Sequence, residues 1–310
     1  MNDTLTRAEG ILRAAAGDRV RTGFPLAPLT SFRLGGPAAL YLEPESDGDL
    51  SAAGEAIVAT GVPFVVIGKG SNILVSDAGF PGLVLRLGHG YRWAARDGDR
   101  LTAGGAIPLP ALAGVALRHG LAGLEFGVAI PATLGGSVRM NAGAHGGAMA
   151  DVVERILTYR LREGRAEPVD AADAGFGYRR SGLADDAVVT GAVVLLHVDD
   201  AARIRERMDE AREWRRLTQP LAEPNCGSVF TNPEGDHAAR LIDAAGAKGK
   251  RVGGASVSQK HANFIVAEPG ARSSDVLQLI REIQALVEQT TGVSLVPEVK
   301  LIGAFDDARR

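Results

Sequence analysis

The stretch from Gly127 to Gly147, GVAIPATLGGSVRMNAGAHGG, most constrains what this chain can fold into. Glycine and alanine dominate it, so it buries little apolar area and rarely forms a core by itself. Residues with little or no side chain let backbone N–H groups approach a large ligand closely. The stretch therefore indicates either one wall around a bulky, phosphate-bearing cofactor or a tight, glycine-rich packing corner. Its composition alone leaves both interpretations open.

The rest of the composition is that of a globular enzyme. The 310 residues suffice for two or three domains, and the net charge of −3 gives no basic excess for nucleic acid. The single cysteine, Cys226, excludes an intrachain disulfide and fits a reducing compartment. No apolar run reaches the length of a membrane span, and the first residues lack the pattern of a signal peptide. We expect a cytoplasmic monomer that binds neither nucleic acid nor membrane.

Periodicity and end signals predict alternating helices and strands. Helices are expected at residues 5–16, 49–60, 108–119, 201–217, 237–245 and 274–290. Strands are expected at residues 38–42, 62–67, 73–77, 82–87, 100–103, 152–161, 187–198, 263–267 and 293–302. Asp47 or Asp49 is expected to cap the second helix, which Gly61 ends. The buried stripe of the helix at 201–217 is expected to hold Ile204, Met208, Ala211 and Trp214 or Arg215.

A second glycine-rich segment, GKGSN at residues 68–72, lies between two predicted strands. A dinucleotide-binding fingerprint would open a helix at such a point, whereas this loop leads into ILVSD. Phosphate binding here would use loop N–H groups rather than a helix N-terminus. A hairpin turn would have a similar sequence, so this segment alone does not settle a function.

The polar residues suggest no metal site and no hydrolase. The six histidines show no metal-ligand spacing, and the GxSxG motif is absent. Cys226 has no base beside it and is expected to be a small turn residue. Arg179 in GYRRSG, Ser228 in NCGSVFTNP and Glu298 in VPEVKLIG lie where loops could hold them near a ligand. Each alone is equally consistent with a structural or solvated side chain.

A strand at 293–302 would place Glu298 on the face opposite Val299 and Leu301.

Taken in order, the motifs resemble the UDP-N-acetylenolpyruvoylglucosamine reductases, the flavoenzymes that make UDP-N-acetylmuramate for bacterial cell walls. The resemblance runs from about Leu29 to Gly303. It rests on TSFRLGG, GKGSNILVSDAGFPG, GLEFGVAIPATLGGSVRMNAGAHG, YRRS, CGSVFTNP, LIDAAGAKG, VSQKHANFIV and EVKLIG. The short interval between Arg179 and Ser228 is similar to the compact subgroup that lacks a tyrosine-bearing loop insertion.

The resemblance implies an α+β fold. A two-subdomain FAD-binding module of the vanillyl-alcohol-oxidase/PCMH type is expected, followed by a C-terminal α+β substrate-binding domain. The expected segments are an N-terminal helix and connector at 1–24, FAD-binding subdomains at 25–85 and 86–202, and the substrate-binding domain at 203–310.

The same resemblance implies non-covalent FAD as cofactor, NADPH as co-substrate and a nucleotide sugar as substrate. Arg179, Ser228 and Glu298 match the catalytic positions. The positions expected to bind FAD are Gly68, Lys69, Gly70, Ser71, Asn72, Ile130, Pro131, Gly135, Gly136, Ser137, Asn141, Ala142, Gly143 and Tyr178. Asn232, Lys260 and His261 match positions that would contact the substrate.

The implied reaction reduces an enol ether. Hydride from flavin N5 would reach the vinyl carbon, and Ser228 would give a proton to the carbon beside the carboxylate. Arg179 and Glu298 would stabilise the charge that develops there, Glu298 only if it is protonated or acts through a neighbour. Ser228 needs a nearby cation to act as an acid, and Lys260 is a candidate. We expect the three catalytic groups to converge beside the flavin.

Two departures and two alternatives accompany this resemblance. Ala132 stands where glycine is usual, which requires a negative φ or mild strain, and His145 stands where an aromatic residue is common. One alternative is another FAD oxidoreductase of the same fold, such as an alcohol oxidase with a tethered flavin. The other is a non-catalytic protein that binds nucleotide sugars.

Overall fold

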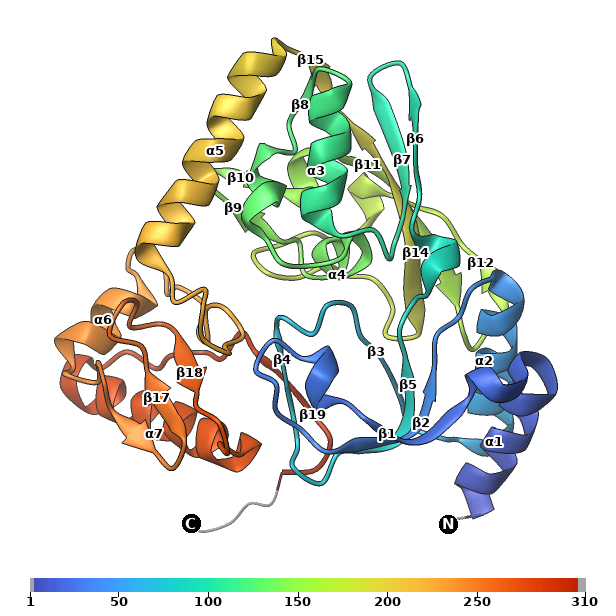
Figure 1. Ribbon diagram of the computed structural model, residues 1–310, viewed down its shortest axis with the longest axis horizontal. Coiled ribbons are helices and arrows are strands. Elements are labelled where there is room, and N and C mark those ends of the chain that lie inside the picture. The colour runs from blue at the N-terminus through green and yellow to red at the C-terminus, as the bar shows by residue number, and fades with distance from the viewer. Residues whose placement is uncertain (1–2, 306–310) are drawn as a thin grey trace. The chain divides into compact units, whose positions relative to one another are not determined.

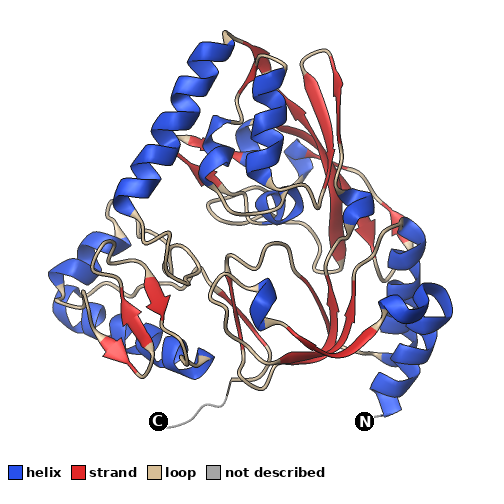
Figure 2. Ribbon diagram, viewed as in Figure 1, coloured by secondary structure: helices blue, strands red, loops and turns tan. Residues whose placement is uncertain are grey.

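The computed structural model describes residues 3–305, which form two compact units (Figure 1). The first unit comprises Met1–Thr22, Ala39–Lys69 and Gly82–Trp214, and the second comprises Gly23–Ala38, Gly70–Pro81 and Arg215–Arg310. Helices and strands occur in both units (Figure 2). Because each unit is discontinuous along the chain, this division does not test the four predicted segments, which stay predictions.

Two helices of the first unit, α1 (Asp3–Ala16) and α2 (Asp47–Thr60), lie side by side (Figure 1). Their buried residues share one cluster with strand residues such as Leu40 and Leu85. The side chain of Ser46 caps α2, so the prediction that Asp47 or Asp49 caps it was wrong. Serine and aspartate both cap helices well, and the first turn begins one residue earlier than a cap at Asp47 would allow.

Asp49 instead anchors α2 to the segment after α1. Arg19 donates from both terminal nitrogens to the Asp49 carboxylate, at 2.7 and 2.6 Å, and the Glu45 N–H donates at 2.8 Å. The Arg19 hydrogen bond is the main cause of a pKa of Asp49 below its usual value, and burial opposes it.

Replacing Asp49 with alanine is therefore expected to lower the free energy of unfolding by about 1–3 kcal/mol, less than for a fully buried pair because Arg19 is half exposed. A depressed folded-state pKa contributes stability above the unfolded pKa, so this contribution is lost as the pH falls below about 4. Urea unfolding at neutral and acidic pH measures both effects. An equal loss in the variant at both pH values would contradict the assigned charge pairing.

A four-stranded sheet has the order β1 (Arg21–Pro25), β2 (Pro37–Leu42), β5 (Phe80–Leu85), β3 (Phe64–Val66). β3 pairs with β5 in parallel, as expected for strands joined by a crossover. The predicted strand at 62–67 is shorter in the structure, because only its central residues pair with β5.

A six-stranded antiparallel sheet lies wholly within the first unit. Its order is β12 (Arg165–Ala166), β11 (Val153–Arg160), β14 (Ala187–Leu195), β7 (Arg100–Gly104), β6 (Ala94–Asp97), with β13 (Val169–Asp170) also paired to β11. Two short pairs accompany it: β8 (Leu121–Ala122) with β15 (His197–Val198), and β9 (Gly143–Ala144) with β10 (Gly147–Ala148). Short 3-10 helices occur at Gly17–Arg19, Ala27–Leu29, His89–Tyr91, Glu125–Ala129, Met149–Asp151 and Ala171–Asp173.

Three helices share a core cluster with this sheet: α3 (Leu109–Arg118), α4 (Leu134–Arg139) and α5 (Ala201–Thr218). The predicted stripe of α5 is confirmed for its residues Ile204, Met208 and Ala211, which are buried. Of the two residues offered for its last position, Trp214 is 49% exposed and Arg215 is partly buried, so Arg215 continues the stripe. α4 interrupts the glycine-rich stretch, where no helix was predicted.

The second unit has its own core around α6 (Ala238–Ala244) and α7 (Ser273–Thr291). Its strands are β16 (Arg251–Val252), β17 (Ala255–Val257) and β18 (Ile265–Ala267), which are antiparallel, and β4 (Ile73–Val75) with β19 (Lys300–Ile302), which are parallel. The Asp77 carboxylate accepts from the N–H groups of Ser273 and Ser274, at 2.8 and 3.0 Å, and so caps α7 from a distant loop.

The closing strand is much shorter than the predicted 293–302. Only Lys300–Ile302 forms a ladder, because its partner β4 is itself three residues long, and Pro297 makes an isolated bridge with Phe230. Val299 is 4% exposed and Leu301 is 49% exposed, so the two do not share a face as predicted. Glu298 lies before the strand, and strand alternation does not orient it.

Candidate active site

A pocket in the first unit is lined by parts of both glycine-rich segments. Its empty volume is about 650 Å³, a figure that includes space open to solvent. The lining residues are Val66, Ile67, Gly68, Lys69, Arg86, Leu87, Arg92, Gly105, Ala106, Thr133, Gly135, Gly136, Arg139, Ala187, Val188 and Val189. The structure thus brings together four of the predicted FAD-binding residues: Gly68, Lys69, Gly135 and Gly136.

The lining fits a large anionic cofactor such as FAD. Lys69, Arg86, Arg92 and Arg139 place four cationic side chains around it, and its glycines expose main chain. Arg86 and Arg92 lie outside every motif recognised in the sequence. Sequence reasoning therefore missed them.

The same glycines also make tight packing contacts. A Cβ on Gly68 would lie 2.6 Å from Thr133 Oγ1, and one on Gly135 would lie 2.9 Å from the Val189 carbonyl oxygen. A Cβ on Gly136 would meet only Thr133 Oγ1, at an ordinary 3.4 Å. Both interpretations of the glycine-rich stretch are therefore partly right: it packs tightly, and it lines a pocket.

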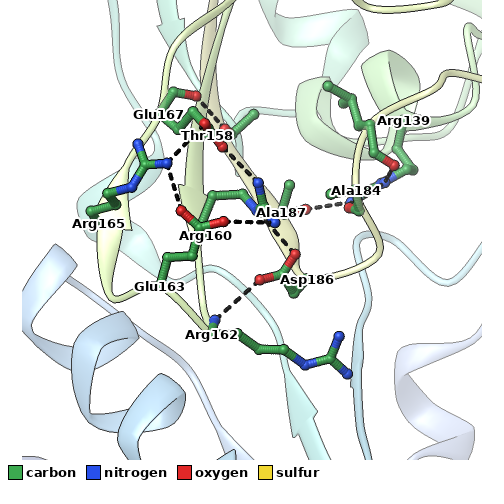
Figure 3. A network of polar contacts seen from close by, with 11 residues as sticks. Arg139, Thr158, Arg160, Arg162, Glu163, Arg165, Glu167, Ala184, Asp186 and Ala187 are labelled. Atoms are coloured by element: carbon green, nitrogen blue, oxygen red, sulfur yellow. Dashed lines mark hydrogen bonds and ion pairs between the residues drawn. The ribbon is translucent and has the colours of Figure 1, made fainter. Parts of the chain in front are cut away.

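A polar network anchors the wall formed by residues 187–189 (Figure 3). Arg139 donates to the carbonyl oxygens of Leu183, Ala184 and Ala187. Burial alone would raise the pKa of Asp186, but hydrogen bonds from the Arg162 N–H and the Arg160 guanidinium lower it overall. Arg139 thus holds residues 183–187 from one side and Arg160 and Arg162 hold Asp186 from the other. This wall of the pocket is therefore fixed by the protein's own contacts.

The remaining predicted FAD residues of the stretch have structural contacts. Asn141 has a φ of +41°; its Nδ2 donates to the Gly177 carbonyl at 3.0 Å, and its Oδ1 accepts from the Ala150 N–H at 2.9 Å. Ser137 is buried, and no hydrogen-bond partner is present for its Oγ. Ser137 is not among the residues that line the pocket, and Ser273 Oγ of the second unit is unpartnered in the same way, so contact of Ser137 with FAD stays a prediction.

The other residues of the stretch lie close to these. Ala142 donates its N–H to the Ser137 carbonyl at 2.8 Å, and Gly143 begins β9. Ile130 packs partly buried against the core, and Pro131 follows it. Ala132 is not among the positive-φ residues, so the glycine-to-alanine departure is accommodated by a negative φ.

Arg179 lies in a loop that Asn141 fastens through Gly177. Its φ is +56°, which is uncommon for a residue with a side chain and marks a strained position. Its guanidinium lies 5.1 Å from the centre of the Tyr178 ring, which is exposed. The structure thus places Tyr178 and Arg179 together, next to the glycine-rich stretch.

His145 has a structural contact of its own. Its φ is +51°, and its ring meets Trp214 edge-on with 5.0 Å between ring centres.

Ser228 and Glu298 lie on neighbouring segments of the second unit. The Glu298 N–H donates to the Val229 carbonyl at 2.7 Å, and Phe230 forms an antiparallel bridge with Pro297. Asn72 Nδ2 donates to the Glu298 carbonyl at 3.3 Å. Two predicted catalytic residues and the end of the GKGSN loop, whose Gly70, Ser71 and Asn72 belong to this unit, are thus held together.

The turn before Ser228 is shaped by Asn225. Its side chain accepts from the Gly227 N–H at 2.9 Å and donates to two carbonyl oxygens upstream. Gly227 has a φ of +78°, which favours glycine there. Cys226 is buried, and burial and the nearby Glu298 raise the pKa of its thiol, which disfavours the thiolate that a nucleophile needs.

The three predicted substrate residues differ in their surroundings. Asn232 is exposed, and its Oδ1 accepts from the Ala238 N–H at the start of α6. Lys260 is exposed and donates to the Arg216 carbonyl at 2.6 Å. His261 is partly buried, and burial together with Lys248 lowers its pKa.

Comparison with known proteins decides the family. Residues 219–302 match the model described as UDP-N-acetylenolpyruvoylglucosamine reductase, C-terminal domain, and residues 38–166 match that of an FAD binding domain. UDP-N-acetylenolpyruvoylglucosamine reductase of Anaeromyxobacter sp. (strain Fw109-5) is 46% identical over 299 residues, which cover 96% of this chain and 93% of that protein. The chain belongs to the UDP-N-acetylenolpyruvoylglucosamine reductase family.

Two further relatives support this reductase assignment. The protein of the same name from Synechococcus sp. (strain JA-3-3Ab) is 44% identical over 298 residues, 95% of each chain. The crystal structure of UDP-N-acetylenolpyruvylglucosamine reductase from Thermus caldophilus has a TM-score of 0.80 at 37% identity and covers 92% of this chain and 99% of that one. The predicted α+β fold with an FAD-binding module is confirmed.

As a family member the chain is an FAD-dependent oxidoreductase. That result favours the reductase over a non-catalytic binding protein and over an oxidoreductase of another family. Within residues 3–305, none of the helices combines the length and apolar character that crossing a membrane requires.

Proposed function

We propose that this protein reduces UDP-N-acetylglucosamine enolpyruvate to UDP-N-acetylmuramate, with non-covalent FAD as cofactor and NADPH as co-substrate. The family membership and the match to an FAD binding domain support this proposal. The one structural observation that carries it is the hydrogen bond from the Glu298 N–H to the Val229 carbonyl, which keeps Ser228 beside Glu298.

FAD, when bound, supplies the hydride that the vinyl carbon receives. Gly68, Lys69, Gly135 and Gly136 would hold it, with Arg86 and Arg92 offering charge to its phosphates. Ser137, which is fully buried, stays a predicted FAD-binding residue. Gly70, Ser71, Asn72, Ile130, Pro131, Asn141, Ala142, Gly143 and Tyr178 stay predicted FAD-binding residues.

Reduction of the vinyl carbon leaves negative charge on the carbon beside the substrate carboxylate. The fixed charge and fork geometry of Arg179 suit stabilisation of that enolate-like state. The Ser228 hydroxyl would donate the proton that completes the reaction. Glu298 would assist by donating or by orienting a neighbour, since a bare carboxylate would repel the charge. That Arg179 acts together with Ser228 and Glu298 stays a prediction, as do the substrate contacts of Asn232, Lys260 and His261.

Anaerobic rapid mixing tests the proposal in two steps. NADPH is expected to bleach the flavin absorbance, and the enolpyruvyl substrate is expected to restore it while UDP-N-acetylmuramate forms. UDP-N-acetylglucosamine, which lacks the vinyl group, is the control and is expected to leave the flavin reduced. Reoxidation by the control, or none by the substrate, would contradict the assignment. Acid precipitation is expected to release yellow flavin into the supernatant, since no covalent tether is proposed.

We further propose that the protein works as a monomer in the cytoplasm. A single buried thiol suits a reducing compartment. Light scattering on the holoenzyme and fractionation of cells measure these two points.

A further inference from the structure

Ser228 opens a short segment, residues 228–231, that is hydrogen-bonded along both edges. One edge faces residues 296–298: the Val229 carbonyl accepts from the Glu298 N–H at 2.7 Å, and the Thr231 N–H donates to the Val296 carbonyl at 3.0 Å. This edge sets the distance between the Ser228 and Glu298 segments.

The other edge is held by one residue, Asn263. Its carbonyl accepts from the Val229 N–H at 2.9 Å. Its side-chain Oδ1 accepts from the Phe230 N–H at 2.9 Å, and its Nδ2 donates to the Phe230 carbonyl at 2.8 Å. Asn263 is only 3% exposed, and the Phe230 ring is buried in the core beside it. The buried Asn263 side chain therefore satisfies the main-chain N–H and carbonyl of Phe230, as a paired strand would.

At neutral pH a carboxamide satisfies both main-chain groups of Phe230. It offers one acceptor and one donor side by side, whereas an ionised carboxylate offers acceptors only and an apolar side chain offers neither. Leaving a buried main-chain group without a partner is costly, so the segment would shift to regain one. The identity of residue 263 is thus dictated by the main chain that follows Ser228.

Asn263 also contacts the predicted substrate loop. Its N–H donates to His261 Nδ1 at 3.3 Å, so the ring proton of neutral His261 lies on Nε2.

We propose that Asn263 is a positioning residue for proton transfer: its amide fixes the segment that carries Ser228 against the segment that carries Glu298. The inference rests on the proposed role of Ser228 as proton donor. Both main-chain groups of Val229 and both of Phe230 are engaged, so the Ser228 main chain has little freedom. A displacement of about 1 Å in a reacting group can cost about a hundredfold in rate.

Asn263→Asp is the first variant to measure, because it keeps the volume and the acceptor but removes the donor. At neutral pH the substrate-dependent reoxidation of flavin is expected to slow about 10- to 100-fold, while reduction by NADPH stays within about twofold. As the pH falls, the introduced carboxyl gains a proton that it can donate to the Phe230 carbonyl. Burial raises the pKa of such a group, so the rate relative to wild type is expected to recover in mildly acidic buffer.

If Asn263→Asp does not fold, Asn263→Ala is measured in its place. It should slow the reoxidation of flavin by the substrate, without the recovery in acid. Asp77→Ala is the matched control, since it removes the α7 cap of the same unit without touching residues 228–231. It is expected to lower stability but leave reoxidation unchanged.

The combination with Ser228→Ala decides the inference. Since Asn263 acts through Ser228, the double variant is expected to be no slower than Ser228→Ala alone. If Ser228→Ala is impaired, two results would overturn this inference. One is a double variant in which the rate losses of the two single variants multiply, and the other is a folded Asn263 variant with the wild-type reoxidation rate. An unimpaired Ser228→Ala would overturn the proposed proton donor and this inference together.

Discussion

Replacing Ser228 with alanine is expected to slow reoxidation of the flavin by the enolpyruvyl substrate by about 10²–10³-fold or more. The loss of one transition-state donor has an effect of this size, and the loss of a sole proton donor has a larger one. Reduction of the flavin by NADPH needs no proton from Ser228 and is expected to stay within about twofold of wild type. Anaerobic stopped-flow measurements of the two half-reactions separate these effects.

Thr231→Val is a suitable control for Ser228→Ala. It removes a hydroxyl from the same segment, one that is bound to the Val296 carbonyl at 3.2 Å. Its reoxidation rate is expected to stay within severalfold of wild type. If Ser228→Ala slowed both half-reactions equally, the role of proton donor would be wrong.

The second large effect is expected for Gly136→Val, which should weaken FAD binding by about 10- to 100-fold, or about 1.4–2.8 kcal/mol. Gly136 lines the pocket, and its Cβ would make only an ordinary contact with Thr133. The new side chain therefore fits the protein but occupies space at the pocket wall. Titration of the apoprotein with FAD, followed by flavin fluorescence, measures the change.

Gly10→Val is the matched control. Gly10 lies in α1 of the same unit, and a Cβ there would meet no atom within 4 Å. Both variants are expected to unfold near the temperature of wild-type apoprotein, because valine costs a helix less than about 1 kcal/mol relative to alanine. Only Gly136→Val should lose the stabilisation that added FAD provides. Undiminished FAD affinity in folded Gly136→Val would contradict the assigned pocket.

Much of the secondary structure follows from local signals, and the errors have identifiable causes. The spacing of Ile204, Met208 and Ala211 leads to Arg215 rather than Trp214, and Arg215 is the less exposed of the two. Residues 293–302 read as one strand, yet only Lys300–Ile302 forms a ladder, because β4 offers three residues to pair with. The length of that partner strand is recorded in no local pattern.

The candidate site likewise combines residues that sequence motifs indicate with a residue that only the fold brings into place. Gly68, Gly135, Ser228 and Glu298 were recognisable because they lie in motifs whose order is specific. Asn263 was not: its side chain bonds a main chain 33 residues away, and the motif around it, VSQKHANFIV, gives no sign of that contact.

The sequence by itself determined the family and the cofactor class, through the resemblance that its ordered motifs carry. It also determined most helix ends, because caps and apolar periods act over a few residues. Only the tertiary structure decided that Asn72, Ser228 and Glu298 are neighbours, that Arg86 and Arg92 join the pocket, and which glycines are needed for packing. These outcomes depend on hydrogen bonds and close contacts between distant segments, and such contacts exist only once the chain has folded.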